Sequence, residues 1–116
     1  MEHKPFRLTA KLEVEKNGIC FLSFKSIELL KLIHSTGSIL AASKIMRISY
    51  QQAWTIVHDL NALGALPVVL RRRGGTTGGG TELTKYGQRL VQVYEEVQAL
   101  HRAYLVELEL RLDCCF

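Results

Sequence analysis

The stretch that most constrains the fold of this chain is residues 38–64, SILAASKIMRISYQQAWTIVHDLNALG. Its pattern predicts two short helices with a tight turn at Arg47-Ile48, the second helix being the longer. Ser38 is a good N-cap for the first helix, because its hydroxyl can accept a hydrogen bond from an early backbone N–H. The small residues Ala41 and Ala42 let two helices cross closely, as a helix-turn-helix requires. We expect the core around the turn to be filled by Ile45, Met46 and Ile48.

The second of these helices carries the strongest local signal. Ser49-x-x-Gln52 is a capping box, in which the two side chains satisfy each other's backbone donors, and Gly64 is a C-cap. The expected buried stripe is Ala53, Ile56, Val57, Leu60 and Leu63. The opposite stripe is mostly polar and consists of Gln51, Thr55, His58 and Ala62.

This polar stripe suits the reading of base edges. Glutamine can pair bidentately with adenine, and threonine can contact a thymine methyl group. An ordinary solvated face is the alternative, and only the preceding helix and turn favour DNA binding over it. Tyr50 and Trp54 lie one turn apart, where each can pack against the hairpin or press on the sugar-phosphate backbone. Core packing is favoured for Trp54, while Tyr50 is equally suited to both roles. His58 has no cysteine or carboxylate partner at metal-ligand spacing, which favours a surface or phosphate-side position.

The beginning of the chain is expected to support these helices. Residues 6–14 alternate between apolar and polar side chains, which predicts a half-buried strand. Asn17-Gly18 is a tight-turn signal, so residues 19–22 are the expected return strand. From about residue 23 to residue 35 the apolar spacing predicts a helix, which Thr36-Gly37 ends.

A glycine-rich hairpin is expected over residues 66–84. A short apolar run leads to Arg71-Arg72-Arg73, a glycine-rich tip at 74–80 and a return strand. Arginine forks suit phosphate oxygens, and glycines let backbone N–H groups approach an anion closely. A nucleotide-binding loop fails in detail, because no Gly-Lys-Ser/Thr follows the glycines. A plain flexible loop stays open as an alternative, but the adjoining arginines favour a DNA-contacting wing.

The final helix is expected over residues 85–113, with Thr84 as its N-cap. Its apolar residues recur at gaps of three and four, which is a heptad stripe. The leucines of its C-terminal half are costly to expose over several turns, so a partner chain is the simplest cover. The predicted dimer interface is Leu90, Val93, Val97, Leu100, Tyr104, Leu105, Leu108 and Leu112. An intramolecular core helix explains the first half of the stripe but not the second.

Composition restricts the class of protein. The chain has 116 residues, 47% of them hydrophobic, which fits one globular domain. Its net charge of +4 agrees with a polyanionic partner but is weak evidence for one. Its three cysteines form no C-x-x-C pair and no zinc spacing. The adjacent Cys114 and Cys115 have the chemistry to oxidise or to bind a soft metal, although a frayed terminus without function is favoured. No signal-peptide pattern and no long apolar run occur, which predicts a soluble cytoplasmic protein.

One set of motifs runs through the chain: Thr36-Gly37-Ser38, Ala41-Ala42, Ser49-Tyr50, Ala53-Trp54, Leu60-Asn61, the glycine-rich wing, and Leu83-Thr84-x-x-Gly87-x-x-Leu90. Together they resemble the N-terminal DNA-binding domain of the ModE family of molybdate-responsive regulators, a winged helix related to that of LysR-type regulators. The resemblance extends from about Leu8 to the last helix. It implies DNA binding by the helix that starts at Ser49 with the wing beside it, and dimerisation by the helix after the wing. Family members that sense molybdate carry it in C-terminal oxyanion-binding domains, and this chain stops at Phe116. No residue here is therefore assigned to molybdate.

The predicted fold is a mainly α winged helix-turn-helix with small β hairpins and a long C-terminal dimerisation helix, in a single domain over residues 1–116. Its expected parts are an N-terminal hairpin (1–22), a three-helix unit (23–64), the wing (66–84) and the dimerisation helix (85–113). The predicted function is a homodimeric, ModE-like transcriptional regulator that binds double-stranded DNA and lacks the oxyanion-sensing domain. No catalytic residue, cofactor, metal site or membrane partner is expected. The candidate DNA-binding residues are Ser38, Ser49, Tyr50, Gln51, Gln52, Thr55, His58, Arg71, Arg72, Arg73, Thr76, Thr77 and Lys85. The alternative is a winged-helix protein–protein interaction module without DNA binding.

Overall fold

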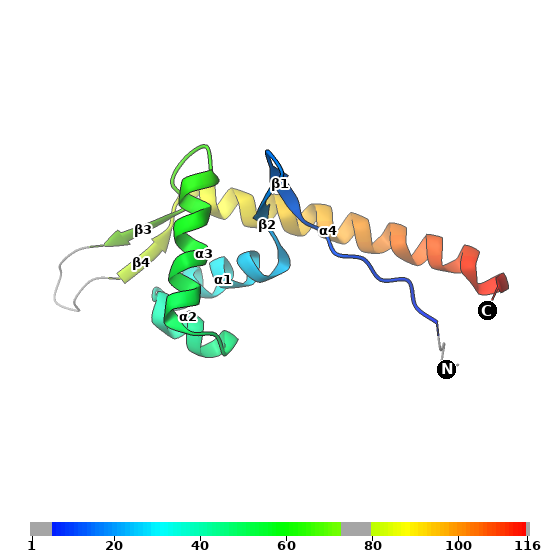
Figure 1. Ribbon diagram of the computed structural model, residues 1–116, viewed down its shortest axis with the longest axis horizontal. Helices are drawn as coiled ribbons and strands as arrows, with labels where there is room; N and C mark the ends of the chain where they lie inside the picture. Colours follow the sequence, from blue (N-terminus) through cyan, green and yellow to red (C-terminus); the bar gives the residue numbers. More distant parts are fainter. Residues whose placement is uncertain (1–5, 73–79, 116) are drawn as a thin grey trace.

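The computed structural model describes residues 6–72 and 80–115, which form a winged helix from which one long helix extends (Figure 1). The elements follow in the order β1, β2, α1, α2, α3, β3, β4 and α4, with a short 3-10 turn, η1, at the end. The long helix makes the molecule elongated, with extents of 61 × 32 × 22 Å. The predicted class, mainly α with two small antiparallel hairpins, is confirmed.

Three helices form the compact part of the molecule: α1 (Phe24–Thr36), α2 (Ile39–Met46) and α3 (Tyr50–Leu63). Each begins at a serine, Ser23, Ser38 or Ser49, whose side chain accepts a hydrogen bond from a backbone N–H three residues further on. Gly37, with φ of 71°, ends α1, and Arg47, with φ of 59°, ends α2. These two left-handed residues make the sharp turns between the helices, so the chain turns where the sequence predicted.

Both caps of α3 differ in detail from the prediction. The Ser49 Oγ accepts from the Gln52 N–H at 3.0 Å, but within the described residues the Gln52 side chain does not return the bond. A complete capping box instead joins Ser23 and Ser26 at the start of α1. Gly64 ends α3 with φ of −65°, so it adopts no left-handed conformation. Glycine suits this position for lack of space, because a Cβ there would lie 2.9 Å from the Leu66 carbonyl oxygen.

The core lies where the three helices meet the base of the second hairpin. Its most buried side chains are Leu29, Leu30, Ile33, Ala42, Ala53 and Val68. The predicted stripe of α3 faces this core, with Val57 and Leu60 buried and Ile56 and Leu63 partly buried.

Two of the predicted core side chains are exposed instead. Ile45 is 58% exposed and Trp54 is 40% exposed. The buried face of α2 is formed by Ile39, Ala42 and Ser43, and Ile45 lies outside this i, i+3, i+4 face. Trp54 directly follows the buried Ala53 and lies at the edge of the α3 stripe. Hydrophobicity alone therefore placed both residues wrongly.

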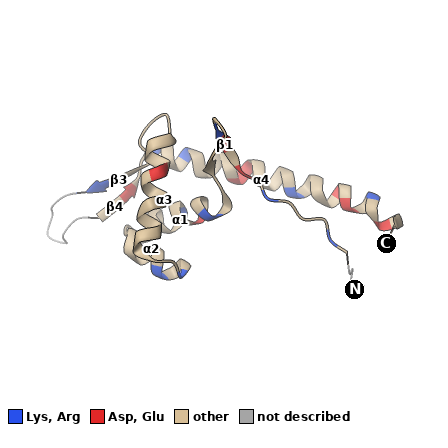
Figure 2. Cartoon of the chain, viewed as in Figure 1, with Lys and Arg blue, Asp and Glu red and all other residues tan. Residues whose placement is uncertain are grey.

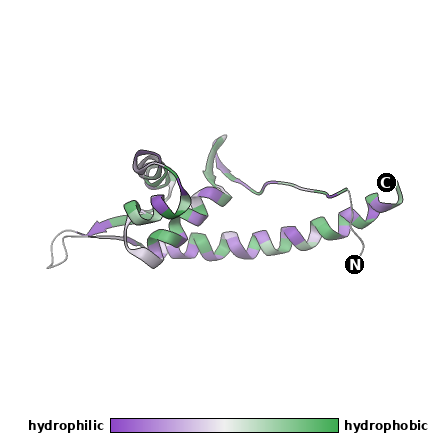
Figure 3. Ribbon diagram, turned by 90° about the horizontal axis from the view of Figure 1, so that it is seen from below, coloured by the Kyte–Doolittle hydropathy of each residue, from purple (hydrophilic) through white to green (hydrophobic). Residues whose placement is uncertain are grey.

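The N-terminal hairpin is shorter than predicted. β1 (Val14–Lys16) pairs antiparallel with β2 (Ile19–Leu22) across a turn in which Asn17 and Gly18 have φ of 52° and 81°. Residues 6–13 form no strand and run beside α4 instead (Figures 1 and 3). The Leu8 N–H donates to the Glu109 carboxylate at 2.7 Å, and the Tyr94 hydroxyl donates to the Leu12 carbonyl at 2.8 Å. The alternating pattern lacks a neighbouring strand edge here, and two backbone groups of the segment bond to side chains of α4 instead.

The second hairpin is the wing, in which β3 (Val69–Arg72) pairs antiparallel with β4 (Gly80–Leu83). Asn61 of α3 anchors its base, because the Asn61 Nδ2 donates to the Val69 carbonyl and the Oδ1 accepts from the N–H groups of Val68 and Val69, all within 2.8–3.0 Å. The Thr81 N–H donates to the Gly37 carbonyl at 2.9 Å. The root of the wing is thus bound to both α3 and the α1–α2 turn.

The long helix α4 (Lys85–Leu112) begins at Thr84, whose Oγ1 accepts from the Gly87 N–H at 2.9 Å. Its first turns pack on the core through Gly87 and the buried Tyr94. Hydrophobic residues continue along the whole helix (Figure 3). None of the helices in the described residues is long and apolar enough to cross a membrane.

Candidate nucleic-acid interface

The outer face of α3 presents a row of polar side chains. Gln51, Thr55, His58 and Ala62 are exposed, as predicted from the helical spacing, and Gln52 is exposed beside them. The Thr55 Oγ1 donates to the Gln51 carbonyl at 2.9 Å, so its hydroxyl proton is used within the helix. Thr55 therefore offers a methyl group and an acceptor to a ligand, whereas the exposed amides of Gln51 and Gln52 keep both donors and acceptors.

A hydrogen bond joins the beginning of α3 to the wing. The Arg71 Nη2 donates to the Tyr50 hydroxyl at 2.8 Å, and both side chains lie at the surface. Tyr50 is 42% exposed, so its ring is neither in the core nor fully in solvent. Between the two elements lies a cleft of about 190 Å³ lined in part by Trp54, His58 and Leu70. Arg71 also lines this cleft, and its bond to Tyr50 sets the position of the arginine relative to α3.

Arg72, the next arginine of the wing, forms an ion pair with Glu82 on the other strand of the wing. Arg72 lies 2.8 Å from the Glu82 carboxylate on the opposite strand, and both side chains are largely exposed. Such a surface pair contributes little to stability. It nevertheless keeps one positive charge of the wing partly neutralised, and Figure 2 shows the basic β3 beside the acidic residue of β4.

The remaining predicted residues are spread over the fold. Ser38 is half-buried and caps α2, with its Oγ accepting from the Ala41 N–H at 3.0 Å. Lys85 is exposed at the start of α4, where no hydrogen bond or ion pair joins it to another described residue. The structure thus brings Ser49, Tyr50 and Arg71 together, and it leaves Ser38 and Lys85 on separate helix starts. Arg73, Thr76 and Thr77 lie outside the described residues.

Three exposed residues in or beside α3 were not among the predicted DNA-binding residues. Trp54 stacks on His58, with ring centroids 5.2 Å apart and an interplanar angle of 19°. Lys44 is exposed on α2, and Arg47 is exposed at the turn just before Ser49. The signal for these two was in the sequence, since two cations closely precede a helix N-terminus. The sequence gives no such signal for the exposure of Trp54, because a tryptophan beside a buried stripe is more often in the core.

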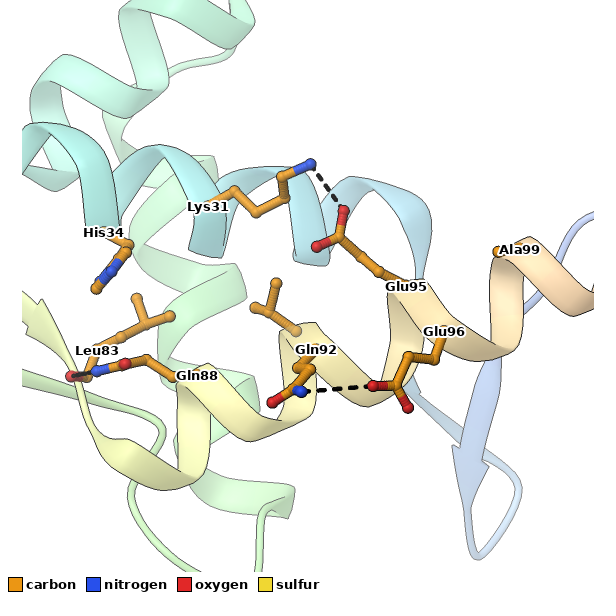
Figure 4. A pocket seen from close by; sticks show the side chains of 9 residues that line it. Lys31, His34, Leu83, Gln88, Gln92, Glu95, Glu96 and Ala99 are labelled. Carbon is orange, nitrogen blue, oxygen red and sulfur yellow. Dashed lines mark hydrogen bonds and ion pairs between the residues drawn. The ribbon is translucent and has the colours of Figure 1, made fainter.

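A groove runs between α1, the end of β4 and α4 (Figure 4). It measures about 690 Å³. On its rim, the Lys31 ammonium lies 3.0 Å from the Glu95 carboxylate and 3.6 Å from the Glu28 carboxylate. The Gln92 side-chain amide donates to the Glu96 carboxylate at 3.4 Å. These carboxylates raise the pKa of Lys31, the hydrogen bond to Glu95 being the largest cause. Because carboxylates outnumber cations on this rim, it is unsuited to DNA phosphates.

The apolar stripe of α4 beyond the core is largely uncovered. Val93, Val97, Leu100 and Tyr104 are 42%, 44%, 73% and 58% exposed, and Leu112 is 38% exposed. Leu90, Leu105 and Leu108 are partly buried. Val106 and Leu110 add to the exposed apolar surface and are 61% and 59% exposed. No group of three or more potential metal ligands occurs in the part of the chain that the structure describes.

No model of a protein family matches the chain. It is 36% identical over 107 residues to the molybdenum transport protein ModE of Azotobacter vinelandii, and 43% identical over 88 residues to the transcriptional regulator ModE of Yersinia pestis. It is also 42% identical over 88 residues to the DNA-binding transcriptional dual regulator ModE of Escherichia coli strain K12. These matches cover 92%, 76% and 76% of the chain. The chain is ModE-like.

The ModE-like chain spans less than half the length of these relatives, namely 40%, 32% and 32% of each. Solved structures share its fold. A LysR family transcriptional regulator matches with a TM-score of 0.54 at 20% identity, covering 79% of the chain and 29% of that protein. FabT of Streptococcus pneumoniae, solved in complex with DNA, matches with a TM-score of 0.53 at 16% identity, covering 74% of the chain and 61% of FabT. The winged-helix assignment therefore stands on both sequence and structure.

Proposed function

We propose that this ModE-like chain is a transcriptional regulator that binds double-stranded DNA as a homodimer. The observation that carries the proposal is the outer face of α3, which is polar, exposed and joined at its N-terminus to the wing by the Arg71–Tyr50 hydrogen bond. A helix of this kind fits the major groove, which presents a distinct donor and acceptor pattern for each base pair.

The roles of the residues follow from their positions. Ser49 and Tyr50 lie at the start of α3 and take the phosphate side, where a helix N-terminus favours anions. Gln51 and Gln52 reach base edges, and Thr55 offers its methyl group to thymine because its proton is already used. The exposed Arg71 and Arg72 neutralise phosphates of the adjoining backbone. Lys44 and Arg47 extend this positive surface beside the turn.

Dimerisation is proposed through the uncovered stripe of α4. Leaving Val93, Val97, Leu100 and Tyr104 in water over several turns is unfavourable by about 25 cal/mol for each Å² of apolar surface. A second copy buries this stripe, and two α3 helices then face half-sites about one DNA turn, roughly 34 Å, apart.

The experiment is a selection of bound duplexes from random DNA, followed by affinity measurements at several salt concentrations. A palindromic consensus is expected, and we expect it to be the same with and without molybdate. Gln51→Ala should relax preference at one position, at a cost of about 1–3 kcal/mol. Arg72→Ala should weaken binding to all duplexes alike and reduce the salt slope by less than about one, because Glu82 already neutralises part of its charge.

Arg102→Ala is the matched control, because it removes one exposed cation from α4, away from α3 and the wing. It should leave the salt slope unchanged. Equal effects of Gln51→Ala and Arg72→Ala on selected and random DNA would contradict the proposed roles. Absence of duplex binding even at low salt would favour the protein–protein interaction module, which would use the exposed stripe of α4 instead.

A further inference from the structure

Two adjacent thiols lie at the end of α4, remote from α3 and the wing (Figure 1). Cys114 and Cys115 belong to the 3-10 turn η1 (Asp113–Cys115), and both side chains are exposed. Their sulfur atoms lie 3.8 Å apart. The Cys114 thiol donates to the Arg111 carbonyl at 3.2 Å, which orients its sulfur on the last turn of the helix.

The distance between the two sulfurs is too long for a disulfide bond and close to that of two sulfurs bound to one atom. It is far longer than a disulfide bond of about 2.05 Å, so the two groups are free thiols. Two thiolate bonds of about 2.3 Å, the usual length to zinc, that meet at a tetrahedral angle place their sulfurs about 3.8 Å apart. The pair therefore stands close to the spacing that one thiophilic atom bound by two sulfurs requires. A pyramidal trivalent arsenic, with a smaller angle between its sulfur bonds, draws the two sulfurs slightly closer together.

We propose that Cys114 and Cys115 form a dithiol site that binds a thiophilic centre, such as trivalent arsenic, through both sulfurs. Two sulfurs suffice for a trivalent arsenical that already carries one organic group. The second bond closes within the molecule, and the resulting effective concentration strengthens binding by about 10²–10⁴-fold over a single thiol.

The third cysteine is a natural comparison. Cys20 lies on β2 and is exposed, and its thiol donates to the Leu22 carbonyl at 3.6 Å. Burial and the nearby carboxylates of Glu13 and Glu15 raise its pKa, which disfavours the thiolate. Cys20 thus offers one sulfur beside negatively charged carboxylates, whereas Cys114 and Cys115 offer two sulfurs at chelating distance.

The reaction with phenylarsine oxide is balanced without a further reagent. Each thiol loses its proton and forms one sulfur–arsenic bond. The two protons leave with the arsenical oxygen as water, and no atom is oxidised or reduced. The product is a cyclic dithioarsenite that bridges neighbouring residues.

The test uses the full chain, reduced with a phosphine that is then removed, and titrated with phenylarsine oxide. Intact mass and titration of residual thiols measure the stoichiometry, and competition with a monothiol measures the affinity. The wild type and Cys20→Ser should each bind one arsenical and lose two thiols. The adduct should survive excess monothiol and be released by a dithiol.

Two further variants decide the proposal. Cys114→Ser and Cys115→Ser should each weaken binding at least a hundredfold, because each leaves one sulfur. Both positions are exposed, so folding should be unaffected, which circular dichroism checks. The proposal is overturned if the wild type takes up no arsenical, if either single variant binds as tightly as the wild type, or if Cys20→Ser removes binding. DNA affinity has no part in these readouts, so the outcome is independent of the proposed function.

Discussion

Replacing Gly87 with alanine tests how closely α4 must approach the wing. Gly87 is buried in the first turns of α4, and a methyl group there would overlap the carbonyl oxygen of Val68. It would also lie 3.2 Å from the Val68 Cγ1 and 3.3 Å from the Leu83 Cγ. The obstructing oxygen belongs to the backbone, so it cannot move aside as a flexible side chain would.

The change in the free energy of unfolding caused by Gly87→Ala is the sum of opposing contributions. Alanine favours a helix interior over glycine by about 1 kcal/mol. Against this, overpacking costs about 1–3 kcal/mol, and a fixed backbone oxygen places this site near the upper limit. The Val68 carbonyl also accepts from the Thr84 N–H at 3.0 Å, and the Thr84 Oγ1 lies 3.2 Å from it while donating more closely to the Pro67 carbonyl at 2.7 Å. Displacing it weakens the cap of α4, which costs about 1 kcal/mol more. We expect a net loss of about 2–3 kcal/mol.

Urea unfolding at one fixed protein concentration measures this loss, because a dimer's stability depends on concentration. The melting temperature should fall by about 8–12 °C. Ala103→Gly, on the exposed surface of α4, is the control for helix propensity and should cost about 1 kcal/mol. A Gly87→Ala protein as stable as the wild type, or more stable, would refute the close approach.

Three other outcomes are expected. Asn61→Ala should destabilise the protein by about 1–3 kcal/mol for each buried N–H of Val68 and Val69 left unpaired, and urea unfolding should detect it. The pKa of Tyr94 is raised by burial and by Glu13, so the folded state holds the phenolic proton more tightly than the unfolded state. Stability should therefore be full below the ordinary pKa of 10.0 and fall as pH rises above it, and Tyr94→Phe should flatten this fall in pH-dependent unfolding. Glu82→Gln should free Arg72 and strengthen binding to every duplex by up to roughly eightfold at 0.1 M salt, and titration of selected and random duplexes checks this.

Much of the fold could be predicted because its signals are local. A serine before a helix and a glycine after it act within one turn of backbone, so Ser38, Ser49 and Gly37 mark their boundaries without reference to the rest of the chain. Asn17-Gly18 likewise makes its own turn. The heptad spacing of α4 lies within a single helix, and its length followed from it.

The candidate site was predictable only in part. The polar stripe of α3 follows from helical spacing, so Gln51, Thr55 and His58 were expected on one face, and they are exposed there. The contacts between elements were not predictable. Neither the Arg71–Tyr50 bond nor the Arg72–Glu82 pair can be read from spacing, because each joins groups on different elements.

By itself the sequence determined the order of the helices, the residues at which they begin and end, the Asn17-Gly18 turn and the exposed stripe of α3. Only the tertiary structure decided which hydrophobic residues are covered and which charges are free. Ile45 and Trp54 are exposed, and residues 6–13 form no strand and instead lie beside α4. The physical reason for this difference is how far apart along the chain the interacting residues lie. Caps and turns depend on neighbours within about four residues, whereas burial and pairing depend on surfaces that meet only after the whole chain has folded.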